Sequence, residues 1–175
     1  MEQRAGKNFT LMILVVVAFI GFIVFMTLVF TTGDFLWFLG GFQEKPAIVI
    51  VYQDGKKFEY RPGMPGFNDL AMGVQRSLDR GVSRPSNIGL SEETHQDAIM
   101  KYTAVEAIFL KPVKLHAYFY TGNPNRMLFP ITGRYTEVPV IFLSEKNEPY
   151  TTLSPVLNTR APLEEALTKL GYRIR

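Results

Sequence analysis

The stretch AIVIVYQDGKKFEYR, residues 47–61, predicts a β-hairpin at the start of the soluble part of this chain. Asp54-Gly55 separates an Ile/Val-rich run from a second run that ends at Arg61. An Asp-Gly pair between two such runs favours a two-residue type I′ turn, because both central residues of that turn need a positive φ. The turn therefore fixes the expected pairing of the two strands.

The register of this hairpin follows by counting outward from the turn. The expected cross-strand pairs are Val51 with Phe58 and Val49 with Tyr60 on one face, and Tyr52 with Lys57 and Ile50 with Glu59 on the other. We expect the first face to belong to the core. Ile48 and Ile50 make the first strand apolar on its other face too, which predicts a strand inside a sheet covered on both sides.

Three segments after the hairpin have helical features. Apolar residues recur at helical spacing over 67–78, and Gly81 follows as a stop signal. Ser91 precedes two glutamates, a pattern typical of a capped helix start. Pro162 in a first turn and Gly171 past the end indicate a short amphipathic helix near the C-terminus.

The remaining regular structure is predicted to be strand. Apolar and polar residues alternate over 113–120, which predicts a strand with one buried face. Residues 138–143 form a second apolar run, and 128–131 a shorter one. Residues 103–112 fit either a helix or a strand, because Pro112 interrupts both.

These segments together predict an α+β fold. The expected order β-β-α-α-β-β-β-α places two or three helices on a mostly antiparallel sheet. Residues 46–175 are long enough for one domain with its own core and too short for two ordinary ones.

A long apolar run precedes the domain. Residues 9–30 carry no charged side chain and, as a helix, would span roughly 33 Å, the thickness of a bilayer core. A cleaved signal peptide is the alternative, but the run is longer than such a segment and no A-x-A site follows it. We therefore expect an uncleaved single-pass signal anchor after a short tail, residues 1–8.

Charged residues around the anchor predict its orientation. Arg4 and Lys7 precede the run, whereas Asp34 and Glu44 are the nearest charges after it. The positive-inside rule then places the N-terminus in the cytoplasm and the domain in the extracytoplasmic space of a plasma or other energy-transducing membrane.

Residues 31–45 form a juncture rich in aromatic side chains. Tryptophan and phenylalanine favour the headgroup layer of a membrane, and exposed aromatics also suit contact with another membrane subunit. Gly40-Gly41 predicts that helical order ends nearby. The candidate contact residues, to lipid or to a protein partner, are Phe35, Trp37, Phe38 and Phe42.

Composition removes several classes of function. The chain has no cysteine, which removes disulfides and thiolate sites. Its formal net charge of +3 is dispersed and lacks the basic runs of a nucleic-acid-binding surface, so we expect no nucleic-acid partner. Arg76, Arg80 and Arg84 are weak candidates for anion binding, since Asp69 and Asp79 lie among them.

The sequence gives no metal or catalytic motif. Glu92 and His95 have the spacing of a carboxylate-histidine site, but a second Glu-x-x-His is missing, so we expect no metal and place His95 on a helix surface. No GxSxG or HExxH is present. Asp69 and Glu106 are an acid pair that only proximity in space could make functional. We assign no catalytic residue and no cofactor.

These observations favour two functions of different classes. The first is an accessory or structural subunit of a larger membrane complex, which acts through protein contacts and has the bilayer and other membrane subunits as partners. The alternative is a membrane-tethered extracytoplasmic domain that binds or senses a ligand. An enzyme is the least favoured class.

Overall fold

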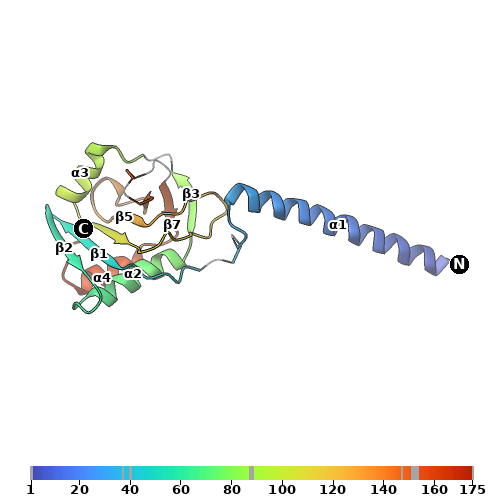
Figure 1. The fold of residues 1–175 in the computed structure, drawn as a ribbon, viewed down its shortest axis with the longest axis horizontal. Coiled ribbons are helices and arrows are strands. Elements are labelled where there is room, and N and C mark those ends of the chain that lie inside the picture. The colour runs from blue at the N-terminus through green and yellow to red at the C-terminus, as the bar shows by residue number, and fades with distance from the viewer. Residues whose placement is uncertain are drawn as a thin grey trace.

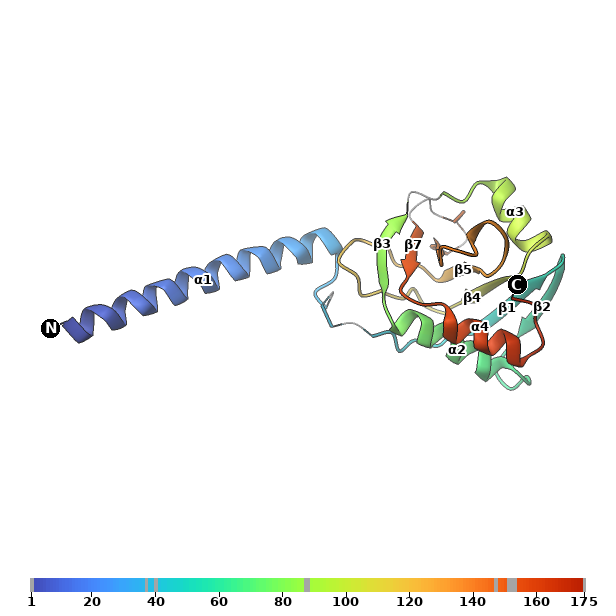
Figure 2. The ribbon, with the colours of Figure 1, turned by 180° about the vertical axis from the view of Figure 1, so that it is seen from behind.

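The computed structural model describes residues 2–36, 38, 39, 41–86, 89–146, 148–150 and 154–174, with backbone alone for 2–8 and 84–86. A long helix, α1 (Glu2–Thr32), projects from a compact domain that holds the rest of the chain (Figure 1). The domain combines antiparallel strands with three helices, as the sequence predicts. The view from behind shows the same separation of α1 from the domain (Figure 2).

The main sheet has five strands in the order β2-β1-β4-β5-β6. Each neighbouring pair is antiparallel. A separate two-stranded sheet pairs β3 with β7. The strands are β1 (Ile48–Gln53), β2 (Lys56–Tyr60), β3 (Val82–Ser86), β4 (Ala104–Ile108), β5 (Arg126–Pro130), β6 (Phe142–Ser144) and β7 (Ser154–Leu157).

The β1–β2 hairpin has the predicted register, with Val51 opposite Phe58 and Val49 opposite Tyr60. Asp54 and Gly55 have φ angles of 51° and 74°, so the turn uses the two positive φ values expected of an Asp-Gly hairpin. Both faces of β1 are covered, because Val49 and Val51 are buried in the core on one face and Ile50 is buried on the other, as predicted.

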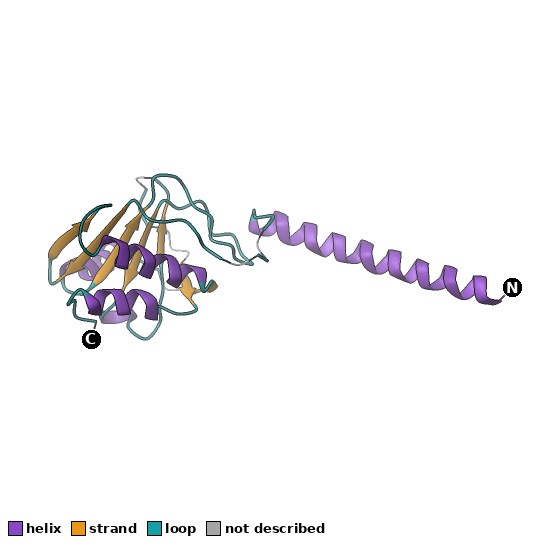
Figure 3. Cartoon of the chain, turned by 90° about the horizontal axis from the view of Figure 1, so that it is seen from below, coloured by secondary structure: helices purple, strands orange, loops and turns teal. Residues whose placement is uncertain are grey.

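Two helices, α2 (Phe67–Asp79) and α4 (Ala161–Lys169), cover one face of the sheet, which we call the helical face (Figure 3). The apolar stripe of α2 packs there with the inward side chains of the strands. The two helices approach closely at Gly73, where an added Cβ would lie 3.1 Å from the Leu163 Cα. This glycine allows one continuous core between the helices and the sheet.

The opposite face of the sheet, which we call the loop face, packs against loops and a second, smaller apolar cluster. Helix α3 (Glu92–Met100) lies beyond one end of this cluster. Its predicted cap is present, because the Ser91 hydroxyl accepts a hydrogen bond of 3.2 Å from the Thr94 N–H. A 3-10 turn at Gly133–Tyr135 places Tyr135 against Phe142 in the same cluster.

The strand predicted over 113–120 is wrong, because these residues lie in a long loop between β4 and β5. Their alternation is nevertheless real, since Val113, Leu115 and Ala117 are buried on the core of the helical face and the residues between them point outward. Alternation reports which side chains are buried. It does not guarantee a neighbouring strand with which the backbone can pair.

Other boundaries also differ from the sequence predictions. The ambiguous segment 103–112 contains strand β4, and Pro112 lies beyond its end. The strand expected over 138–143 is shorter, because β6 begins at Phe142 and Val140 makes only an isolated bridge with Val156. The sequence does not predict β3 or β7, since each is short and each holds an internal proline.

Helix α1 contains a segment, Phe9–Thr32, that is long and apolar enough to cross a membrane. A signal sequence near the N-terminus would pass the same test of length and composition. The helix ends at Thr32, and the next residue, Gly33, has a φ of 66° and donates its N–H to the Val29 carbonyl. Helical order therefore stops before Gly40-Gly41, the pair that predicted its end.

Candidate functional site

Glu106 is the central residue of a polar cluster on the loop face of the sheet. It lies on β4 between Ile50 of β1 and Leu128 of β5, and it is buried. An isolated buried carboxylate is costly, so the protein must supply donors to it. The sequence carries one signal of this site, a single acid in the otherwise apolar run from Ala104 to Leu110.

Three side chains donate to the Glu106 carboxylate. The Tyr52 hydroxyl lies 2.9 Å from Oε2, and the Tyr150 hydroxyl lies 2.7 Å from Oε1. The Arg126 guanidinium donates through Nε and Nη2 at 3.0 and 2.6 Å, both to Oε1. The Arg126 guanidinium also lies over the Tyr150 ring, 5.3 Å from its centroid. These contacts join residues that are far apart in the sequence.

The cluster shifts the titration of its members. Burial alone would raise the pKa of Glu106, but hydrogen bonds from Tyr150 and Arg126 outweigh it and hold that pKa below its ordinary value. Burial and the neighbouring carboxylate raise the pKa of Tyr52 and of Tyr150. Glu106 is therefore charged at neutral pH while both phenols keep their protons, an arrangement suited to holding a charge and unsuited to a tyrosine base.

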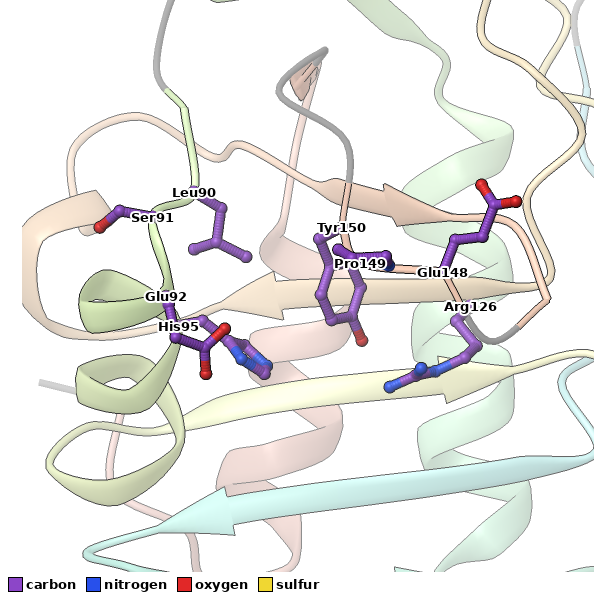
Figure 4. A pocket seen from close by; sticks show the side chains of 8 residues that line it. All are labelled: Leu90, Ser91, Glu92, His95, Arg126, Glu148, Pro149 and Tyr150. Atoms are coloured by element: carbon purple, nitrogen blue, oxygen red, sulfur yellow. The ribbon is translucent and has the colours of Figure 1, made fainter.

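A polar groove of about 500 Å³ opens beside this cluster (Figure 4). Figure 4 shows Tyr150 between His95 of α3 and Arg126 of β5. The His95 and Tyr150 rings pack with their centroids 5.3 Å apart. The lining residues are Leu90, Ser91, Glu92, His95, Arg126, Glu148, Pro149 and Tyr150.

The charges in this groove are mixed. Arg126 and His95 face it together with the acids Glu92 and Glu148. Among the described residues, no group of three or more His, Cys, Asp or Glu side chains is placed to hold a metal ion. Asp69 does not join Glu106, because it lies on α2 at the helical face and pairs with Lys169 at 2.7 Å. The groove can accept a small polar molecule with both signs of charge.

A second region of interest joins α1 to the domain. The Asp34 carboxylate lies 2.6 Å from Nδ1 of His116, a residue of the β4–β5 loop. Burial would raise the pKa of Asp34, but the hydrogen bonds from His116 and from the Leu36 N–H lower it. Further along the juncture, the Phe42 N–H donates to Asp79 of α2 at 3.0 Å. The chain after α1 is therefore fastened to the domain at two points.

The predicted aromatic contact residues take different places in this juncture. Phe35 and Phe38 are 61% and 53% exposed, and both pack edge-to-face on Phe25 of α1. Phe42 is instead 4% exposed and packs on Phe109 in the domain core, which leaves its ring no surface for lipid or a partner. Trp37 lies outside the described residues.

The arginine candidates do not gather into an anion site in the part of the chain that is described. Arg76 and Arg80 are exposed on α2, and the side chain of Arg84 lies outside the described residues. Arg76 lines a shallow groove between α2 and α4 that also holds Asp69, Glu165 and Lys169. This mixture of charges weakens any preference for anions.

Comparison with known proteins identifies no relative of this chain. The chain matches no family model, no curated protein and no solved structure. The function must therefore be argued from the juncture and the polar groove themselves.

Proposed function

We propose that this chain is a single-pass membrane protein that serves as an accessory or structural subunit of a larger membrane complex and acts through protein contacts. Helix α1 is the anchor, the N-terminus is cytoplasmic and the domain is extracytoplasmic. The aromatic residues Phe35, Trp37 and Phe38 of the juncture form the proposed partner surface, and of these Phe35 and Phe38 are described and exposed.

One observation carries this proposal: the described part of the juncture is fastened to the domain by hydrogen bonds. The Asp34–His116 and Phe42–Asp79 hydrogen bonds hold its two ends, and the Gln75 side chain donates to the Gln43 carbonyl at 2.9 Å. A subunit that must present its domain in a set orientation to a membrane partner needs such a connection. A domain that only captures a diffusing ligand works equally well on a flexible tether.

The exposed aromatics supply a second line of support. Phe35 and Phe38 pack on Phe25 but leave more than half of their surface uncovered within this chain. Aromatic side chains are typical of interface hot spots, where truncation of a buried ring costs about 2 kcal/mol or more.

The proposal is tested by co-purification from native membranes in mild detergent. We expect Phe38→Ala and Trp37→Ala to lose most of the bound partner, whereas Phe38→Leu keeps a part of it because an apolar body remains. Phe30→Leu is the matched control, since Phe30 is an exposed phenylalanine on α1 itself. Full retention of every partner by both alanine variants, or a lone monomer for the native chain, would contradict an accessory subunit.

The orientation has its own test. Protease added to intact cells or spheroplasts should digest the domain if the N-terminus is cytoplasmic. Complete protection, with digestion only after lysis, would reverse the assignment made from Arg4 and Lys7.

The polar groove favours a second candidate, a tethered ligand-binding domain. A small polar molecule held there would contact His95 and Arg126. Native mass spectrometry of the purified full chain should then show a bound small molecule that His95→Ala loses, while an exposed change elsewhere on α3, Glu93→Gln, keeps it. If the native chain has the mass of the polypeptide alone, no small molecule is bound, and this result would contradict the ligand-binding candidate.

A further inference from the structure

We infer that the β4–β5 loop, residues 109–125, is a membrane-contacting element that rests in the headgroup layer of the bilayer. The inference depends on the proposed anchoring by α1. It goes beyond that proposal, because it assigns lipid as the partner of a segment far from the anchor in sequence.

The β4–β5 loop lies beside the C-terminal end of α1. It reaches from the sheet to the C-terminal end of α1, as Figures 1 and 2 both show. Lys114 Nζ lies 3.4 Å from the Gly33 carbonyl, and the Tyr120 ring lies 3.4 Å from where a Cβ of Gly33 would be. With the His116–Asp34 contact, three loop residues touch the two residues that directly follow the apolar segment Phe9–Thr32.

The contact with Gly33 and Asp34 sets the depth of the loop relative to the bilayer. A spanning helix of about 20 residues crosses the hydrocarbon core, so the 24 residues of Phe9–Thr32 extend to the headgroups. Gly33 and Asp34 then lie at the interface, and the loop residues bound to them lie at the same level.

The outward side of the loop carries apolar and amphipathic side chains. Leu110 is 90% exposed, and Tyr118 and Tyr120 are 51% and 58% exposed. Lys111 is also exposed. Tyrosine and lysine carry an apolar body with a polar tip, which makes them favourable where hydrocarbon meets water, and an exposed leucine gains by insertion.

The loop is held in place by its own buried side chains and hydrogen bonds. Val113, Leu115 and Ala117 are buried in the domain core, so the alternating residues are held outward. The loop is also closed at its base, because Val113 and Phe109 donate their N–H groups to Pro124 and Asn125 at 2.9 and 2.8 Å. A loop held in this way meets the bilayer with little further loss of conformational freedom.

The absence of cysteine from the chain allows a direct test by single-cysteine spin labelling. Leu110→Cys and Tyr118→Cys report on the loop, and Lys56→Cys at the hairpin turn is an exposed control on another part of the domain. Ala18→Cys in the middle of the apolar segment reports on the anchor. The full chain is placed at one copy per nanodisc of phosphatidylcholine and phosphatidylglycerol, and access of oxygen and of a water-soluble nickel chelate to each label is measured.

We expect the oxygen-to-nickel accessibility ratio at positions 110 and 118 to be several-fold higher than at position 56, and the ratio at position 18 to be higher still. Loop labels as accessible to nickel as the control, with a protected label at position 18, would overturn this inference and leave the anchor intact. A nickel-accessible label at position 18 would overturn the anchor and the inference together. Because the nanodisc holds no other protein, a protected loop cannot be due to a partner subunit.

Discussion

The helical face and the loop face of the sheet are stabilised by different kinds of interaction. On the helical face, apolar side chains of the strands meet the stripes of α2 and α4, and the contact is non-directional burial. On the loop face, β4 presents Glu106 to three donors from β1, β5 and the segment after β6. The first face depends on the apolar area that is removed from water. The second depends on atoms placed within hydrogen-bond distance.

The largest effect is expected from a cavity on the helical face. Leu70 of α2 is fully buried there, so Leu70→Ala should destabilise the domain by about 4 kcal/mol through lost burial and an unfilled void. Urea unfolding of the full chain in mild detergent, followed by the near-ultraviolet circular dichroism of its tyrosines, measures this change. Met72→Ala is the control, because Met72 is exposed on the same helix and should change stability by less than about 0.5 kcal/mol. An equal loss in both variants would show that burial on this face is not decisive.

The second effect comes from the charge on the loop face. Glu106→Gln keeps the shape of the side chain but leaves the Arg126 guanidinium without its carboxylate, which should cost about 3 kcal/mol. This cost is at the lower end of the range for breaking a buried ion pair, because Arg126 keeps partial contact with solvent. The double variant Glu106→Met with Arg126→Met removes both charges and should recover a part of the loss, because the Tyr52 and Tyr150 hydroxyls still lack their acceptor. If the double variant were the less stable of the two, the carboxylate and its donors together would be a net source of stability.

The two faces also differ in how far the sequence could predict them. The hairpin, α2 and α4 follow from local patterns: a turn that needs two positive φ values, and apolar residues at helical spacing. The Glu106 cluster has no such pattern, because its partners are 20, 44 and 54 positions away from it. A lone acid within an apolar strand predicts that buried partners exist, but it does not identify which residues they are.

The β4–β5 loop shows the same limit from another side. Its alternation correctly predicts which side chains are buried, but a strand also requires a free edge beside it, and tertiary structure supplies that edge. The fastening of the juncture was equally hidden, since the Asp34–His116 contact joins residues 82 positions apart. Local pattern thus predicts the helical face well and the contacts near α1 poorly.

Acid should remove the charge-dependent stability of the loop face, whereas the apolar burial on the helical face does not titrate. The pKa of Glu106 is lower in the folded chain than its ordinary value of 4.5. Its stabilising contribution is therefore complete above pH 4.5 and is lost as the pH falls through the lower, folded pKa. Urea titrations between neutral and acidic pH should show a loss of stability in that range that Glu106→Gln reduces. An unchanged pH profile in Glu106→Gln would assign the acid sensitivity to other carboxylates.

The smallest effect is expected from the ion pair on the helical face. Lys169 of α4 lies 2.7 Å from Asp69 of α2, but their side chains are 66% and 40% exposed. Water and salt screen such a pair, and ordering two long side chains offsets part of the gain, so Lys169→Met should cost less than about 1 kcal/mol. A double-mutant cycle with Asp69→Asn isolates the coupling, measured at low and at high salt by the same urea unfolding. A coupling as large as that of Glu106 with Arg126 would mean that the short distance, rather than burial, sets the strength of ion pairs in this domain. A weak, salt-sensitive coupling is what the contrast between the two faces requires, because the same pairing of charges is decisive only where the carboxylate is removed from solvent.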